Sequence, residues 1–337
     1  MKISSLLPIL FGTSNTKLTD GGIAHHKNIL DGADLTSIIP ARLEYAAAAR
    51  NPLPNPRFIF HNKIPKCGST TMANILAALE TTNNFNLIHY HPCIKSPCDK
   101  ALDGRKNSDY LADELAPEVE EASAERPLVL VKHHHFTNFT AYDLEQPTMI
   151  NVARDPVNRF VSSFYFRRFG FNRNEGVRRE FIGRKKQEMG LEECVLSEAH
   201  ECSEAGSNQA FLEYICGSDK FWPECGNIAN PKSRERALER AKKHVLNEYL
   251  AIGILEDIEN TLTLFERMVP TVFHGAPAVY RAIGETITNQ TSTAKKEPVS
   301  AEVREKLEKG PLRHQVDLYN LIKATYEQKL RDFGITK

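Results

Sequence analysis

Short apolar runs alternate with segments of helical periodicity along most of the chain. The apolar runs lie at 58–60, 86–90, 127–131, 148–153 and 249–255. A run that is apolar at every position, such as 127–131, is typical of a strand buried on both faces of a parallel sheet. Strands that alternate with helices predict an α/β fold, with a parallel central sheet flanked by helices.

Apolar residues at helical spacing predict where the helices lie. One helix is expected directly after the first strand, and others at 108–123, 156–169, 233–248 and 258–268. Residues 300–333 keep heptad-like apolar positions, which predicts a long helical C-terminal tail made of one helix or two.

Three segments lack this periodicity. Residues 1–55 are rich in Gly, Asn, Asp, Thr and Pro, which predicts a poorly ordered stem. Residues 173–226 are loop-rich, and 284–298 are polar and irregular. The chain is therefore expected to consist of a stem at 1–55 and one folded domain at 56–337.

The loop after the first strand is the first candidate for chemistry. Residues 58–72 have the pattern of a buried strand, a tight loop and the first turn of a helix. A helix N-terminus presents unpaired N–H groups and partial positive charge, so it can hold a phosphate. Lys63 and Lys66 add full charges in this loop. The candidate N-caps of the helix are Ser69, Thr70 and Thr71.

The order of residues in this loop differs from that of the common nucleotide-triphosphate loop. That loop has Gly, four residues, and then Gly-Lys-Ser or Gly-Lys-Thr. Here Lys66 precedes Gly68, and Ser-Thr-Thr follows. The order argues against an ordinary ATP or GTP site. It leaves open a phosphate site of another kind or a plain strand–turn–helix corner with a surface lysine.

A second candidate lies where the strand at 148–153 runs into the next helix. The carboxyl ends of strands are the places where α/β folds bind ligands. Arg154 offers a planar fork suited to a phosphate, and Ser162 can add a hydroxyl from the helix. Asp155 can cap the helix. The alternative is that Arg154 and Asp155 form a structural ion pair.

Three histidines follow the apolar run at 127–131: His133, His134 and His135. In an extended chain the first and third point to one face and the second to the other. One of them is a candidate general base, because histidine titrates nearest neutral pH. A metal site and a histidine run that simply ends a strand are the alternatives.

The charge balance limits the partners of the chain. Lys plus Arg equals Asp plus Glu, at 43 each, so a polyanion would have to meet a local basic patch. Residues 167–186 contain such a cluster, which comprises Arg167, Arg168, Arg173, Arg178, Arg179, Arg184, Lys185 and Lys186. The neighbouring aromatic residues have helix-core spacing and not that of a base-stacking platform, so no nucleic acid is expected.

Six of the seven cysteines form couples that are close in sequence. The couples are Cys93 with Cys98, Cys194 with Cys202, and Cys216 with Cys225. Such couples, flanked by Pro, Gly and Ser, predict disulfide-closed loops in an oxidising compartment. The glycosylation acceptors Asn138 and Asn289 point the same way. The opening residues, 1–11, fit a weak signal peptide or the start of a trimmed luminal fragment.

Several of these stretches together resemble a known family. They are Asn62–Ser69, His133–Phe136, Arg154–Phe160, Phe166–Gly170, Ala237–Lys242 and Gly253–Glu256. The chain resembles the Golgi 2-O-sulfotransferases of glycosaminoglycans over about residues 57–335, and most of all the uronyl branch that acts on chondroitin and dermatan sulfate. The resemblance implies a P-loop-like sulfotransferase fold.

The resemblance implies 3′-phosphoadenosine 5′-phosphosulfate as the donor of a sulfuryl group. The 5′-phosphosulfate would lie against Lys63, Lys66, Cys67, Gly68, Ser69, Thr70 and Thr71. Lys66 would lie near the bridging oxygen, and Arg154 with Ser162 would hold the 3′-phosphate. Lys295 and Lys296 would reach phosphate from a donor-closing loop around 291–296.

On the acceptor side, the resemblance implies His135 as the base that takes the proton of a uronic acid 2-hydroxyl. His133 would be its neighbour in the acceptor site, and Arg178 and Arg179 would bind the sulfated polymer. His134 replaces a smaller residue common in the family. Asn138 lies close to the expected base, so low glycan occupancy is expected there.

No metal is expected, because lysine and backbone N–H groups can neutralise the charge on the leaving oxygen and the sequence shows no metal-binding motif. The resemblance also implies the Golgi lumen and a type II membrane anchor, which is not visible in this chain. The heparan sulfate relatives form trimers through C-terminal contacts, and the tail here is long enough for a homotrimer. A heparan sulfate 2-O-sulfotransferase and a non-catalytic glycan- or nucleotide-binding protein are the alternatives.

Overall fold

The structure, a computed structural model, describes residues 55–89, 125–171, 189–204, 209–217 and 221–336. All of them belong to one compact unit, Leu35–Lys337. The predicted helix at 108–123 lies outside the described residues, as does most of the predicted stem.

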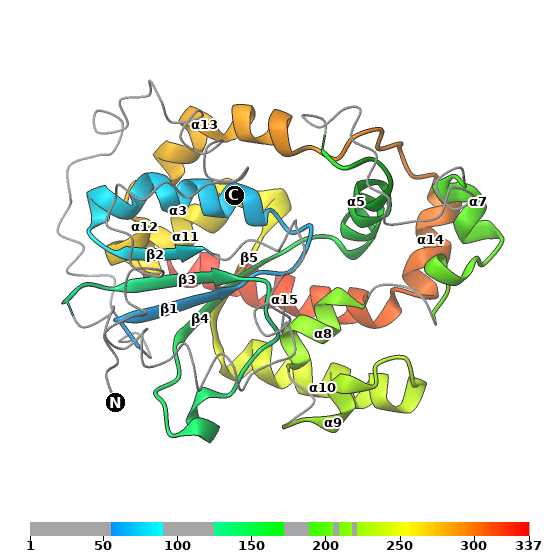
Figure 1. The fold of residues 1–337 in the computed structure, drawn as a ribbon, viewed down its shortest axis with the longest axis horizontal. Helices are drawn as coiled ribbons and strands as arrows, with labels where there is room; N and C mark the ends of the chain where they lie inside the picture. Colours follow the sequence, from blue (N-terminus) through cyan, green and yellow to red (C-terminus); the bar gives the residue numbers. More distant parts are fainter. Residues whose placement is uncertain (1–54, 90–124, 172–188, 205–208, 218–220, 337) are drawn as a thin grey trace, which may run out of the picture. The chain divides into compact units, whose positions relative to one another are not determined.

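A five-stranded parallel sheet forms the centre of this unit (Figure 1). Its strands are β1 (Phe58–Asn62), β2 (Asn86–His89), β3 (Leu128–Lys132), β4 (Thr148–Ala153) and β5 (Tyr249–Ile254). Their order across the sheet is β2-β3-β1-β4-β5, and every neighbouring pair is parallel. The side chains of β1, β3 and β4 are buried along their whole length, as continuous apolar runs predict. The parallel α/β fold is therefore confirmed.

Helices cover both faces of the sheet. One group packs together above it in Figure 1: α3 (Ser69–Asn83), α11 (Ile258–Met268), α12 (Pro270–Phe273) and α13 (Ala276–Thr291). A second group also packs together: α8 (Ala210–Cys216), α9 (Pro223–Gly226), α10 (Pro231–Asn247) and α15 (Arg313–Asp332). Single 3₁₀ turns occur at η3 (Phe139–Tyr142), η5 (His200–Cys202) and η6 (Leu255–Asp257). Among the described helices, none combines the length and apolar character that crossing a bilayer requires.

The expectation of an irregular segment at 284–298 is wrong for its first half. Helix α13 continues to Thr291. It buries Val279, Ile283 and Ile287, which recur every four residues and therefore share one face. Glu285, Thr286 and Thr288, which lie beside these buried positions, are polar and exposed, and such polarity resembles a loop in the sequence.

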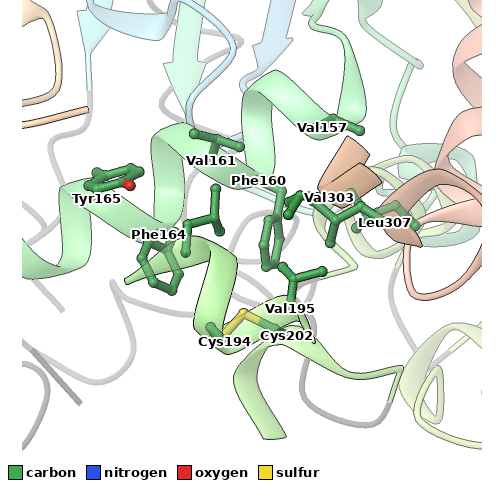
Figure 2. Close-up of a cluster of buried hydrophobic side chains, with 12 residues drawn as sticks. Val157, Phe160, Val161, Phe164, Tyr165, Cys194, Val195, Cys202, Val303 and Leu307 are labelled. Atoms are coloured by element: carbon green, nitrogen blue, oxygen red, sulfur yellow. A yellow bond between two sulfur atoms is a disulfide. The ribbon is translucent and has the colours of Figure 1, made fainter. Parts of the chain in front are cut away.

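A third group of helices, α5 (Pro156–Phe169), α7 (Leu191–Leu196) and α14 (Ala301–Lys309), encloses its own apolar cluster (Figure 2). From α5, Val157, Phe160 and Phe164 are fully buried there. Val195 of α7 and Leu307 of α14 pack against them. This cluster fixes the direction of α5, the helix that follows β4.

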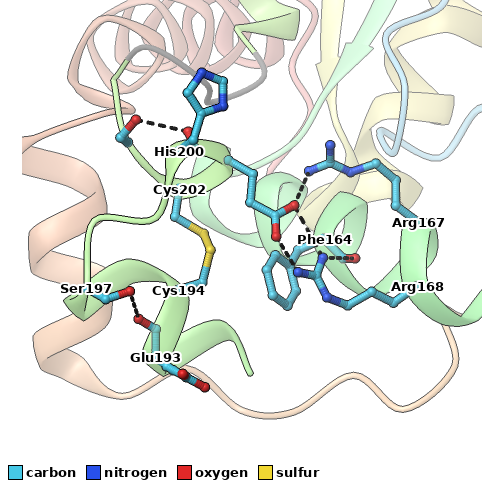
Figure 3. Close-up of a disulfide and its surroundings, with 10 residues drawn as sticks. Phe164, Arg167, Arg168, Glu193, Cys194, Ser197, His200 and Cys202 are labelled. Carbon is cyan, nitrogen blue, oxygen red and sulfur yellow. Dashed lines mark hydrogen bonds and ion pairs between the residues drawn. A yellow bond between two sulfur atoms is a disulfide. The ribbon is translucent and has the colours of Figure 1, made fainter. Parts of the chain in front are cut away.

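Two of the predicted disulfides are present, Cys194–Cys202 and Cys216–Cys225. The couple Cys93 and Cys98 lies outside the described residues. Cys67 is a free, buried thiol. The first disulfide ties α7 to η5, next to the C-terminal half of α5 (Figure 3).

Two members of the predicted basic cluster are engaged within the protein. The guanidinium groups of Arg167 and Arg168 both pair with Glu201, and Arg168 stacks 3.4 Å from the ring centroid of Phe164 (Figure 3). The Arg168 side chain is 1% exposed. Arg168 is therefore a structural residue and cannot contribute to a surface patch, contrary to the prediction. The members from Arg173 to Lys186 lie outside the described residues.

Candidate active site

The site lies where the chain changes direction across the sheet. β1 and β4 are neighbours, but the chain leaves β1 towards β2 and leaves β4 towards β5, on opposite sides. Ligands of open α/β sheets bind at the carboxyl ends of the strands at such a switch point. Both predicted phosphate loops, which begin at Lys63 and at Arg154, start here.

The N-cap of the helix after β1 lies one residue before the predicted caps. Gly68 is the N-cap of α3, with φ at 77°, and no side chain caps the helix. Ser69, Thr70 and Thr71 are therefore first-turn residues, so their prediction as N-caps is wrong. Leu255 packs so closely that a Cβ at Gly68 would lie 2.5 Å from its Cδ1.

The start of α3 is suited to an anion. The first turn carries no acidic side chain, and its N–H groups are not used by a side-chain cap. The N–H groups and hydroxyls of Ser69, Thr70 and Thr71 therefore come together with the partial positive charge of a 15-residue helix.

Lys66 is held in an unusual conformation in the same loop. Its φ is 67°, a left-handed value that costs a residue with a Cβ some energy. The Arg154 guanidinium donates a hydrogen bond to its carbonyl oxygen at 3.3 Å. The Lys66 ammonium lies 3.9 Å from the ring centroid of Phe166 and 4.7 Å from that of Phe171. The strain is therefore opposed by contacts from β4 and α5.

A second concentration of positive charge surrounds Arg154. Its side chain is 22% exposed and lies 3.9 Å from a carboxylate oxygen of Glu256. The pKa of Lys296 is lowered by burial and then by the charge of Arg154. Two cations that repel each other this way, with one carboxylate beside them, would be stabilised by a bound anion.

The segment that follows α13 is attached to α5. The hydroxyls of Ser162 and Thr293 lie 3.0 Å apart. Phe171 and Thr293 form an antiparallel bridge, and the Ala294 N–H donates to the Gly170 carbonyl at 3.0 Å. This attachment brings Lys296 to the same corner as Arg154. The Lys295 ammonium lies instead over the C-terminal end of α5, 5.3 Å from the ring centroid of Phe169.

The histidine run lies on the other side of the Lys63 loop. The Nδ1 atom of His133 lies 2.9 Å from the Lys63 carbonyl oxygen. Because a carbonyl only accepts, Nδ1 carries the proton, and the lone pair of neutral His133 is on Nε2. His135 is buried, and its ring packs 5.1 Å from that of Tyr214. His134 is fully buried and donates to the His135 carbonyl at 2.7 Å.

Lys63 lies with these histidines. Its side chain is buried, and its amine nitrogen is 2.7 Å from Nε2 of His89, the last residue of β2. Burial lowers the pKa of Lys63 to about 7. The structure therefore groups Lys63 with His89 and His133, and its charge depends on pH near neutrality.

The start of α3 and the surroundings of Arg154 form two corners suited to an anion, and Cys67 adjoins both of them. Its thiol is nevertheless unreactive. Burial raises the pKa of the Cys67 thiol to about 12, although the nearby charges of Arg159 and Arg154 act to lower it. A thiol of that pKa is a poor nucleophile, because the thiolate is the reactive form. Cys67 therefore fills space below the loop.

Four further predicted residues concern the polymer and the glycans. Arg178 and Arg179 lie outside the described residues. Asn138 precedes η3, and its side-chain oxygen accepts a hydrogen bond from the Thr140 hydroxyl at 2.6 Å. Asn289 is exposed on α13. Glycosylation of either residue stays a prediction.

Sequence reasoning missed several residues that the structure brings to the site. No role was assigned to His89, Tyr214, Glu256 or Thr293, although Glu256 ends the matching stretch Gly253–Glu256 and Thr293 lies in the segment 291–296. His89 ends a predicted strand, and a polar residue at a strand's carboxyl end is a signal that could have found it. For Tyr214, Glu256 and Thr293 the sequence does not reveal the partners, because their contacts join residues that are far apart in the chain.

The profile of the sulfotransferase family matches residues 55–321. Uronyl 2-sulfotransferase of Homo sapiens is 33% identical over 289 residues, which are 84% of this chain and 66% of that protein. Heparan sulfate 2-O-sulfotransferase 1 of Xenopus laevis is 30% identical over 282 residues, 83% of this chain and 71% of that protein.

The chain spans just under two thirds of the length of the uronyl 2-sulfotransferases of Homo sapiens and Mus musculus, 66% and 65%. The matched residues 55–321 contain the whole parallel sheet and every described part of the candidate site. The fold, the two anion corners at one switch point and the extent of the match agree, and the chain belongs to the sulfotransferase family.

Proposed function

We propose that the protein transfers a sulfuryl group from 3′-phosphoadenosine 5′-phosphosulfate to the 2-hydroxyl of a uronic acid in chondroitin or dermatan sulfate. The observation that carries the proposal is the meeting of the α3 N-terminus, Arg154 and the histidine run at one switch point, in a chain of this family. The similarity to uronyl 2-sulfotransferase supports the choice of the uronic acid 2-hydroxyl.

The donor fits the two anion corners. It supplies the sulfuryl group and leaves as adenosine 3′,5′-bisphosphate, so both ends of the molecule are anionic. The N–H groups at the start of α3 and Lys66 suit the 5′ end, and Arg154, Ser162 and Lys296 suit the 3′-phosphate. Lys66 is the residue assigned to the leaving phosphate oxygen, where a fixed cation lowers the barrier.

Proton removal from the acceptor is assigned to the histidine run. His135 is the proposed base, and the rings of His133 and His135 both pack against that of Tyr214. The hydrogen bond from His133 to the Lys63 carbonyl supports a second assignment, because it leaves Nε2 of His133 as a proton acceptor. Replacing each histidine separately distinguishes the two.

The acceptor is proposed to be a sulfated glycosaminoglycan polymer that meets Lys63, His89 and His133 in the site. Arg178 and Arg179 are proposed to bind the polymer beyond it. The Golgi lumen, a membrane anchor outside this chain, occupied glycans and a homotrimer belong to the same proposal. The two disulfides support an oxidising compartment.

A transfer assay with three acceptors tests the proposal. Labelled donor is incubated with desulfated dermatan, chondroitin and N-sulfated heparosan, beside the variants His135→Ala and His133→Ala. The proposal predicts label on dermatan or chondroitin, lost when the base is removed. Label on heparosan alone would make the protein a heparan sulfate 2-O-sulfotransferase. Donor binding with no transfer to any acceptor would favour a non-catalytic binding protein.

A further inference from the structure

Two aromatic rings stand beside the ammonium group of Lys66. Its Nζ is 3.9 Å from the ring centroid of Phe166 and 4.7 Å from that of Phe171. The two rings are themselves 4.7 Å apart and tilted by 54°. Both distances lie within the range in which a ring face attracts a cation. All three side chains are half-buried, so water screens the attraction less than it would on an open surface.

Phe171, which carries the second ring, also takes part in the contacts that attach the segment after α13 to the end of α5. Phe171 bridges Thr293, and Gly170 accepts a hydrogen bond from Ala294. The same segment contains Lys296, which lies at the Arg154 corner, and Lys295, whose ammonium lies over Phe169. The ring therefore links the position of Lys66 to the position of this segment, although the two are more than two hundred residues apart in sequence.

We propose that Phe166 and Phe171 are positioning residues for Lys66. The inference rests on the proposed function and deepens it. The rings hold the ammonium group at the 5′ end of the donor site. Through Phe171 they also couple the position of this group to the position of residues 292–296. Aromatic faces suit this task because they attract a cation without neutralising it, whereas a carboxylate would compete with the donor's phosphate.

The left-handed backbone of Lys66 supports this role. A residue with a Cβ keeps such a conformation only where its surroundings hold it. The Arg154 hydrogen bond fixes the Lys66 carbonyl, and the rings fix the far end of the side chain. Both ends are therefore placed before a ligand arrives, which lowers the entropy lost on binding.

A double-mutant cycle tests the inference by the affinity for adenosine 3′,5′-bisphosphate, measured by titration calorimetry. The variants are Phe166→Leu/Phe171→Leu, Lys66→Met, and the combination of all three. Leucine keeps the apolar packing but removes the ring, so a packing role alone is separated from a cation-directed one. Phe221→Leu, which alters a half-buried ring against Tyr142 and Trp222, is the matched control.

We expect the leucine pair to weaken binding roughly three- to thirtyfold when Lys66 is present and less than twofold when it is methionine. The single variant Phe171→Tyr, which keeps an aromatic ring at this position, should keep most of the wild-type affinity. An equal loss in both backgrounds, or no loss in either, would overturn the positioning role. A folded wild type that does not bind the bisphosphate would overturn the proposed function, and this inference with it.

Discussion

The guanidinium group of Arg154 donates a hydrogen bond to the carbonyl oxygen of Lys66 at 3.3 Å. These residues follow different strands, β4 and β1, which are neighbours in the sheet. One hydrogen bond therefore joins the two loops that the proposed donor would contact. It also fixes how far apart the two anion corners lie, so Arg154 has both a binding and a structural role.

Replacing Arg154 by alanine should weaken the binding of adenosine 3′,5′-bisphosphate by roughly 10- to 100-fold. The reason is the loss of a charge-assisted contact, worth about 1.5–3 kcal/mol. The effect should be much smaller for adenosine 5′-monophosphate, which lacks the 3′-phosphate. The exposed pair of Arg281 with Glu259 provides a control, and Arg281→Ala should change neither affinity. Equal losses for both nucleotides would contradict the assignment of Arg154 to the 3′-phosphate.

Replacing Gly68 by alanine should destabilise the protein by about 1–3 kcal/mol. The residue has φ at 77°, and a new Cβ would meet Leu255 at 2.5 Å. Urea unfolding measures the change. Gly190→Ala is the matched control, because a Cβ there meets no atom within 4 Å and φ is −70°. If both variants had the same stability, the close approach of Leu255 would not govern this loop.

The burial of Lys63 should make stability depend on pH. Burial lowers its pKa to about 7 from 10.5, so between these values the unfolded chain binds more protons than the folded one. Stability therefore rises with pH across that window, by up to about 1.4 kcal/mol per pH unit, and the full cost of burying the charge is present below pH 7.

The comparison of wild type with Lys63→Met isolates this effect, because methionine keeps the length of the side chain without the charge. The variant should be more stable than wild type at pH 6, and the difference should shrink between pH 7 and 10. Lys232→Met, at an exposed position, should show a difference that is constant with pH. A constant difference for Lys63→Met would mean that the amine keeps its charge when buried.

Removing the Cys194–Cys202 disulfide should cost about 2–3 kcal/mol, because the bond closes a short loop of sequence separation 8. Glu201 is the neighbour of Cys202 and pairs with the buried Arg168 (Figure 3), so loosening this turn also weakens that ion pair. Urea unfolding of Cys194→Ala/Cys202→Ala gives the loss. Full reduction of the wild type should produce a larger loss, because it also breaks Cys216–Cys225. An unchanged midpoint in the double variant would refute the structural role.

Sequence reasoning predicted well those helices and strands whose determining residues are neighbours in the chain. Helix α5 has the predicted bounds, because Pro156 occupies its first turn and Gly170 follows its last. The strands matched to within about two residues, since each is an apolar run. Helix α13 was missed entirely, and its second half was expected to be irregular because only Ile287 marks the buried face there.

Sequence reasoning named candidate site residues but could not predict their contacts. The approach of Lys63 to His89 depends on β2 lying beside β3, and that order is a property of the whole sheet. The contact of Lys66 with Phe166 depends on the turn from β4 into α5. Gly68 replaced the expected serine and threonine caps because the loop enters α3 through a left-handed residue.

The central claim is transfer of a sulfuryl group to the 2-hydroxyl of a uronic acid, and the position of the new sulfate tests it most directly. Desulfated dermatan is incubated with the donor and wild-type protein, digested to disaccharides and analysed by mass spectrometry with reference standards. We predict disaccharides that carry sulfate on the uronic acid at position 2. Sulfate found on the hexosamine instead would contradict the account.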